Sequence, residues 1–162
     1  MKSLRVQKSR PLREAADREI AFDELPSYVG YQVRRAQAKI FGEFADALGA
    51  MDFTPGSFGV LTLIRANPGI TQVALAAAFG VDKSTLSPVI VRLEKRGLVR
   101  RRVLERDRRC QALYLEASAE TVFLAARERV RAFEASVAAR LSKGEQRELA
   151  RLLAKLEAGK AA

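Results

Sequence analysis

The chain has 162 residues, of which 48% are hydrophobic and 30% charged, and its formal net charge is +10. This is the composition of a soluble globular domain. The sequence contains no histidine and a single cysteine, Cys110, which excludes imidazole-dependent triads, histidine metal sites, intrachain disulfides and cysteine zinc clusters. No nucleotide-binding glycine motif, signal-peptide pattern or ~20-residue apolar run is present. We therefore expect a cytoplasmic protein that is not an enzyme and carries no cofactor or metal.

The positive charge is concentrated in two segments. Residues 1–18 hold six basic and two acidic side chains, and residues 92–109 hold nine basic and three acidic ones. The rest of the chain sums to zero. A field concentrated in this way indicates a polyanionic partner.

Residues 1–22 combine scattered charges with few apolar side chains, so we expect a flexible basic arm. A long helix is predicted to open at Leu25-Pro26, with the proline near its first turn. Its apolar stripe consists of Val29, Val33, Ala36, Ile40, Phe44 and Ala47. Phe41 and Leu48 widen this stripe, which indicates more than one packing partner.

Two short helices follow. Thr54-Pro55 is an N-cap followed by proline at the first helical position, and Asn67-Pro68-Gly69 has the chemistry of a terminating turn. Thr71 is predicted to cap the next helix, and Gly80 stands where a left-handed C-terminal cap is expected.

A further helix is predicted over 83–96, closed by Gly97. Together with the preceding helix and the short turn it forms a helix-turn-helix, which places its second helix in the DNA major groove. The predicted inward residues are Leu86, Ile90 and Leu93, and Val91 is expected to face outward. The predicted DNA contacts of this helix are Lys83, Ser84, Thr85, Ser87, Pro88, Arg92 and Lys95.

Pro88 conflicts with a helix that begins at Lys83. An internal proline removes one backbone hydrogen bond and crowds the preceding turn. The helix therefore begins later, at Ser84 or Thr85, or it bends; both alternatives remain open.

The segment 98–116 changes to partial alternation around a charged tip, which predicts a two-stranded hairpin, or wing. An arginine at the tip suits the negative potential of the minor groove. The predicted contacts are Arg106, Asp107, Arg108 and Arg109, with Asp107 pairing to Arg109 or a neighbour to hold the shape of the tip. The alternative is a solvated tip without a partner.

Residues 117–141 predict a helix roughly 37 Å long. Ser142 to Glu145 has the pattern of a capping box that opens a last helix. The leucines of that helix, Leu149, Leu152, Leu153 and Leu156, lack an evident partner within a compact winged lobe. A second subunit would supply one.

The segment 71–116 resembles the core of the MarR family of bacterial regulators. The family's wing signature, Asp-x-Arg followed by leucines ahead of a long helix, matches Asp107, Arg109, Leu113 and Leu115. Glu116 stands where the family usually has threonine, which puts the capping of the long helix in doubt. The similarity covers Leu25 to about Glu157.

This resemblance implies a mainly α fold with a small β-hairpin wing, in which a winged helix-turn-helix lobe adjoins a helical dimerisation region. The expected parts are the arm 1–22, a dimerisation helix in 23–52, the DNA-binding lobe 53–116 and dimerisation helices in 117–162. It also implies a homodimer on a pseudo-palindromic double-stranded DNA operator, acting as a repressor that a small aromatic molecule releases. A non-specific or architectural DNA-binding protein without an effector is the alternative, and a protein-interaction module is a further rival.

The opening segment 25–44 also resembles a subgroup that responds to aromatic acyl-coenzyme A thioesters. This similarity implies effector contacts at Tyr28, Tyr31, Arg34, Arg35 and Phe58. The arginines equally suit an exposed helix face, and Phe58 equally suits the core. Cys110 raises a redox-sensor hypothesis, although its place on the wing differs from that of the family's cysteine sensors.

Overall fold

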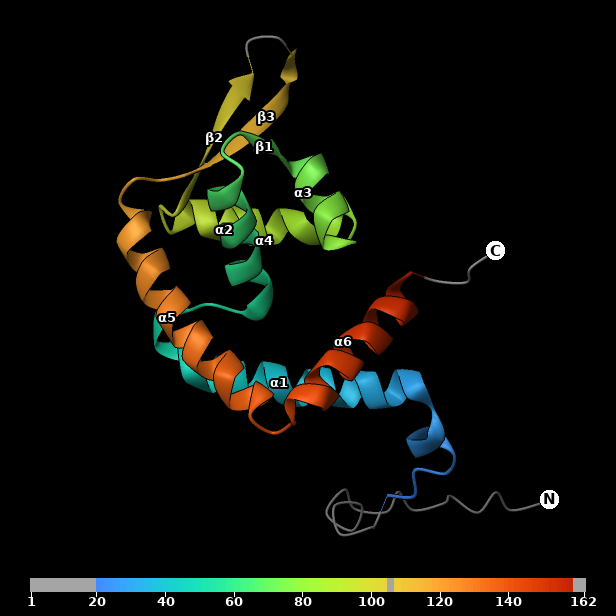
Figure 1. Cartoon of the computed structure of the whole chain (residues 1–162). Coiled ribbons are helices and arrows are strands. Elements are labelled where there is room, and N and C mark those ends of the chain that lie inside the picture. Colours follow the sequence, from blue (N-terminus) through green and yellow to red (C-terminus); the bar gives the residue numbers. More distant parts are fainter. Residues whose placement is uncertain (1–19, 105–106, 159–162) are drawn as a thin grey trace, which may run out of the picture. The chain divides into compact units, whose positions relative to one another are not determined.

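The computed structural model describes residues 20–104 and 107–158, with the side chains of 104–110 outside that description. Six helices, α1 to α6, and three strands follow one another in these residues (Figure 1). Their bounds are α1 Val29–Leu48, α2 Pro55–Ala66, β1 Ile70–Thr71, α3 Gln72–Phe79, α4 Lys83–Lys95, β2 Val99–Leu104, β3 Asp107–Leu115, α5 Ala119–Ala138 and α6 Lys143–Glu157. The chain divides after Gln37 into two compact units. The mainly α fold with a small antiparallel sheet is confirmed.

The first long helix begins later than predicted. Pro26 lies in a separate 3-10 turn, Leu25–Ser27, and Tyr28 then adopts an extended conformation before α1 starts at Val29. The predicted stripe is buried only toward the end of the helix, at Phe44 and the adjoining Leu48, with Ile40 and Ala47 partly buried. Val29 and Val33 are exposed.

The caps of α2 and α3 are confirmed. The Thr54 side chain accepts a hydrogen bond from the backbone N–H of Ser57, and the Ser57 side chain accepts one from the backbone N–H of Thr54, so the two residues form a capping box. Thr71 caps α3 through the N–H of Ala74. Gly80 ends α3 with φ 63°, a left-handed conformation that glycine adopts without steric cost.

Helix α4 begins at Lys83 and continues through Pro88 to Lys95, so the later start at Ser84 or Thr85 is wrong. The proline leaves the carbonyl of Ser84 without its usual backbone donor. Gly97, with φ 66°, ends the helix, and Leu98 N–H donates to the Leu93 carbonyl at 3.0 Å. This hydrogen bond, which spans five residues, is typical of the Schellman motif that ends helices.

The sheet has three strands in the order β1-β3-β2, all antiparallel. The predicted hairpin is confirmed as β2 and β3, with Val99 opposite Leu115 and Arg101 opposite Leu113. The sequence prediction missed β1, a two-residue strand that pairs Ile70 with Leu113. A two-residue strand is too short to show an alternating pattern, and the sequence indicated only a turn before Ile70 and a helix cap at Thr71.

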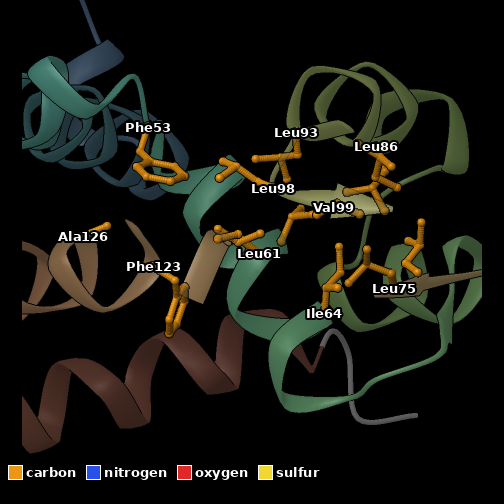
Figure 2. Close-up of a cluster of buried hydrophobic side chains, with 14 of the residues drawn as sticks. Phe53, Leu61, Ile64, Leu75, Leu86, Leu93, Leu98, Val99, Phe123 and Ala126 are labelled. Atoms are coloured by element: carbon orange, nitrogen blue, oxygen red, sulfur yellow. The ribbon is translucent and has the colours of Figure 1, made fainter. Parts of the chain in front are cut away.

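One continuous core fills the unit from Ala38 onward. Leu61 and Ile64 of α2 point into a cluster built from α3, α4 and the sheet (Figure 2). Its other fully buried members include Leu75, Ile90, Leu93 and Leu113. Phe123 and Ala126 extend this core to α5, so the lobe and the first half of α5 share one apolar interior.

Helices α5 and α6 match their predicted positions, with α5 shorter at both ends than 117–141. Ser118 precedes α5 without a side-chain cap, in keeping with the doubt raised by Glu116. The capping box of Ser142 and Glu145 is confirmed. In the part of the chain that the structure describes, no single helix has the length and apolar content to cross a membrane.

Candidate nucleic-acid interface

Helices α3 and α4 meet at a bend of 114°, within the range of helix-turn-helix pairs. The side-chain amide of Gln72, at the start of α3, donates a hydrogen bond to the Lys83 carbonyl at the start of α4 (3.2 Å). This bond and the shared core hold the N-terminal end of α4 against α3.

Helix α4 has two chemically distinct faces. Its apolar face, Leu86, Ile90 and Leu93, is at most 3% exposed. The opposite face carries the side chains that the sequence predicted as DNA contacts. Lys83, Ser84, Thr85, Pro88, Arg92 and Lys95 are exposed, and Ser87 is half-buried. The burial of the apolar face therefore presents the predicted residues to solvent, as a DNA-reading helix requires.

The wing tip cannot be described in the same way. Arg106 lies outside the described residues, and so do the side chains of Asp107, Arg108, Arg109 and Cys110. The minor-groove contacts, the pairing of Asp107 and the redox hypothesis for Cys110 stay predictions.

Among the side chains that the structure describes, three cations of the basic segment 92–109 form ion pairs or hydrogen bonds within the protein. Arg101 pairs with Glu94 at 2.8 Å, and Arg100 pairs with Glu116 at 3.5 Å. Arg96 donates to the backbone carbonyls of Met51 and Asp52. By contrast, Arg92 and Lys95 form no hydrogen bond or ion pair with the residues that the structure describes. Sequence reasoning counted all of these cations alike, because ion pairs across elements are invisible to charge counting.

Arg96 joins the C-terminal end of α4 to the joint between α1 and α2. Its guanidinium lies 4.6 Å from the ring centroid of Phe53, which is buried in the core. The two carbonyl bonds satisfy acceptors at the end of the 3-10 turn Gly49–Met51. Arg96 is therefore a positioning residue for α4.

A second arginine joins α2 to α5. Arg65, in the last turn of α2, contacts both carboxylate oxygens of Glu120, with the shortest N–O distance 2.6 Å. Its guanidinium also lies 5.0 Å from the ring centroid of Phe123, which stacks on Phe58 at 5.6 Å. Hydrogen bonding to Arg65 lowers the pKa of Glu120 and raises that of Arg65. The pair fixes the lobe to the first turn of α5.

The predicted effector residues fall in both units. Near the N-terminus, the Tyr28 hydroxyl donates to Glu24 at 2.8 Å, a bond that raises the pKa of Tyr28. Arg35 lies 5.8 Å from the ring centroid of Tyr31, and Arg34 is exposed. Phe58 belongs to the other unit and packs against its core, which favours the core interpretation that the sequence left open. Their grouping in one effector site stays a prediction.

Sequence reasoning missed an open hollow of about 600 Å³ between the second half of α1 and α5, lined by both charged and apolar side chains. Glu43 and Arg140 pair across it, with an N–O distance of 2.5 Å, and hydrogen bonding to Arg140 lowers the pKa of Glu43. Asp46, Arg129 and Phe133 also line it. In the described residues, no group of His, Cys, Asp and Glu side chains is placed to hold a metal ion.

Comparison with known proteins decides the family. The MarR family model matches residues 53–111, which include α2 to α4 and most of the hairpin. A Thauera aromatica protein described as a transcriptional regulator for the hcr operon is 32% identical over 139 residues, covering 85% of this chain and 84% of that protein. The chain belongs to the MarR family. It is a DNA-binding transcriptional regulator and not an enzyme.

Two solved structures of the transcriptional repressor CouR share this fold. CouR bound to a 23-mer DNA duplex is 29% identical, with a TM-score of 0.78, and the match covers 86% of this MarR-family chain and 99% of CouR. CouR bound to p-coumaroyl-CoA is 26% identical, with a TM-score of 0.79, over 88% and 100% of the two chains. Both matches extend well beyond the winged lobe.

The pair Arg65–Glu120 gives a pH-dependent prediction. Because the folded-state pKa of Glu120 is lowered, its contribution to the free energy of unfolding is present at neutral pH. That contribution is lost as the pH falls from about 4.3, the ordinary glutamate pKa, through the lowered value. Urea unfolding should therefore show Glu120→Gln less stable than the unmodified protein at pH 7, with the difference closing in acid. Glu134→Gln, exposed on α5, is the control. A difference that persists unchanged at pH 3 contradicts the assignment.

Proposed function

We propose that this MarR-family protein is a homodimeric repressor that binds a pseudo-palindromic operator and is released from it by a small aromatic ligand. The observation that carries the proposal is the amphipathic character of α4, the second helix of the helix-turn-helix. One side of α4 is buried, and the exposed side holds hydroxyl and basic side chains. The proposed lobe is 53–116, flanked by dimerisation helices in 23–52 and 117–162. The proposed site of action is the cytoplasm, where the operator lies.

DNA recognition would divide among three groups of residues. Lys83, Ser84, Thr85, Ser87 and Pro88 would face base edges, because the N-terminal end of a recognition helix enters the groove first. Arg92 and Lys95 lie further along α4 and would contact phosphates. The wing residues Arg106 to Arg109 would reach the minor groove. The CouR structure on a DNA duplex supports this use of the fold.

A second subunit is proposed from the apolar face of α6. Leu149, Leu152, Leu153 and Leu156 lie on one side of the helix and are each 43–57% exposed. Four leucines in a stripe are an unusual feature for a solvent-facing helix. A partner helix from another copy would bury them, and two lobes would then face two half-sites about one turn of DNA apart.

Effector release is proposed to act through α5. Because Arg65 and the Phe58–Phe123 stack tie α2 to the first turns of α5, a ligand that shifts α5 would carry the lobe with it. A ligand that favours a lobe spacing mismatched to the operator lowers DNA affinity by that difference in binding free energy. An aryl-coenzyme A thioester is the proposed ligand class, supported by the contact of Arg35 with Tyr31 and by CouR with p-coumaroyl-CoA.

The DNA proposal is tested by gel shift on the region upstream of the protein's own gene, with a scrambled duplex as control. With about six to ten phosphate contacts, affinity should fall by roughly 10³ to 10⁵ between 50 and 200 mM salt. Arg92→Ala and Lys95→Ala should each lower the slope of log affinity against log salt by about 1. Arg131→Ala, on α5, should leave the slope unchanged. Equal affinity for the scrambled duplex would favour the architectural alternative.

The dimer proposal is tested by sedimentation velocity. Leu152→Glu places a charge in the apolar stripe of α6 and should convert the dimer to monomer, because a buried unpaired charge is strongly unfavourable. Arg147→Glu, on the opposite face of the same helix, should leave the dimer intact. Circular dichroism checks that both variants fold. A chain that is monomeric without any substitution contradicts the proposal.

The effector proposal is tested by adding aromatic acids and their coenzyme A thioesters to the gel shift. A thioester should release the DNA, whereas coenzyme A alone should not. Arg35→Ala should raise the thioester concentration needed by at least about tenfold, the worth of one charge-assisted hydrogen bond, with operator affinity unchanged. If no acid or thioester releases the DNA, the ligand class is wrong and the DNA-binding proposal stands.

A further inference from the structure

The first two turns of α4 lack most of the long side chains that usually read bases in the major groove. From Lys83 to Val91 the sequence is KSTLSPVIV, which contains no arginine, asparagine or glutamine. The exposed groups there are the hydroxyls of Ser84 and Thr85, the ring of Pro88 and the side chain of Val91, which is 39% exposed. Beyond Lys83 at its start, which is also exposed, the first two turns therefore present short hydroxyl and apolar groups.

This composition limits which base pairs the helix can distinguish. Guanine is read in the major groove by arginine or lysine, and adenine by asparagine or glutamine, through paired hydrogen bonds. Lys83 is the one long cation of this stretch, while Arg92 lies about 13 Å further along the helix axis. The amide of Gln72 is engaged with the Lys83 carbonyl. The 5-methyl group of thymine is the one apolar feature of the major-groove base edges, and apolar side chains recognise it.

Pro88 adds an independent observation. A proline inside a helix loses a backbone hydrogen bond and disfavours the helix by roughly 3 kcal/mol. Burial of its ring does not offset this loss, because Pro88 is exposed and borders an open hollow of about 130 Å³ together with Thr54 and Arg92. Pro88 therefore lowers the stability of α4 without a compensating contact in the core. It lies at the centre of the outward face, where its rigid apolar ring would meet a base edge.

We infer that Pro88 and Val91 determine specificity by contacting thymine methyl groups in each half-site of the operator. The inference rests on the proposed function, since it requires α4 to enter the major groove. Pro88 and Val91 lie three residues apart, so they share one side of the helix and would contact neighbouring base pairs. The hydroxyls of Ser84 and Thr85 would add single hydrogen bonds to either bases or phosphates.

The experiment begins with selection of duplexes from a randomised pool by the full-length protein. The selected duplex is then synthesised with uracil in place of thymine, one position at a time, which removes only the methyl group. Thymines in the flanking sequence outside the selected site serve as controls. Affinity should fall about fourfold for each contacted methyl, the effect of exposing one CH₂-sized group, and flanking substitutions should have no effect.

Two variants assign the contact to α4. Val91→Ala should abolish the loss at one thymine position and Pro88→Ala at the neighbouring one, so that thymine and uracil duplexes bind equally there. Pro88→Ala should also raise the thermal unfolding midpoint, because alanine restores the helix. A purely structural role for Pro88 would change the unfolding midpoint alone and leave the thymine-to-uracil ratio as it was.

Loss of the methyl contact and loss of sequence-specific binding give different results in this experiment. If the selected site tolerates uracil at every position, or if the uracil loss is unchanged in both variants, the methyl contact is wrong while sequence-specific binding stands. If selection yields no preferred sequence although duplexes are bound, the proposed function itself is wrong, and the inference with it.

Discussion

The burial of three side chains on one face of α4 is the constraint on which the rest of the interface depends. Leu86, Ile90 and Leu93 are almost completely buried, and burial of each such side chain contributes about 1.5–3 kcal/mol. The same packing fixes the rotation of the helix about its axis. Because that rotation is fixed, Ser84, Thr85, Pro88 and Arg92 face outward together. A helix free to rotate would present a mixture of both faces.

Arginines serve two purposes in this protein. Arg65 and Arg96 lie over buried phenylalanine rings and bind acceptors on neighbouring elements, which joins the lobe to α5 and to the α1–α2 joint. Arg92 stays on the outward side of α4 and is available to a phosphate. Net charge therefore overstates the number of cations that DNA can neutralise. The number of free cations sets the salt dependence of DNA binding.

The sequence predicted most of the helices because their signals are local. Thr54, Thr71, Gly80 and Ser142 are caps whose chemistry is complete within a few residues, and the apolar spacing of α4 identified its buried face. The errors have equally physical origins. Pro88 suggested a later start for α4, yet the packing of Leu86 and Ile90 outweighs the local preference against an internal proline.

The candidate site was predictable only in part. Exposure of the predicted DNA contacts on α4 follows from helical periodicity, and the structure agrees except that Ser87 is half-buried. Strand β1 and the pairs Arg65–Glu120 and Arg96–Met51 join residues far apart in the chain, so no local pattern indicates them. The sequence left Phe58 as either an effector contact or a core residue. Its stacking on Phe123 favours the core, and this contact joins residues that are distant in the chain.

Hydroxyl-radical footprinting of the upstream DNA, with the full-length protein at low salt, tests most directly whether two copies of α4 read the duplex. Two protected segments on each strand, centred about one helical turn apart, are expected from a symmetric pair of lobes. Protection spread evenly along the duplex, or a single protected segment, would contradict the proposed seating of paired recognition helices.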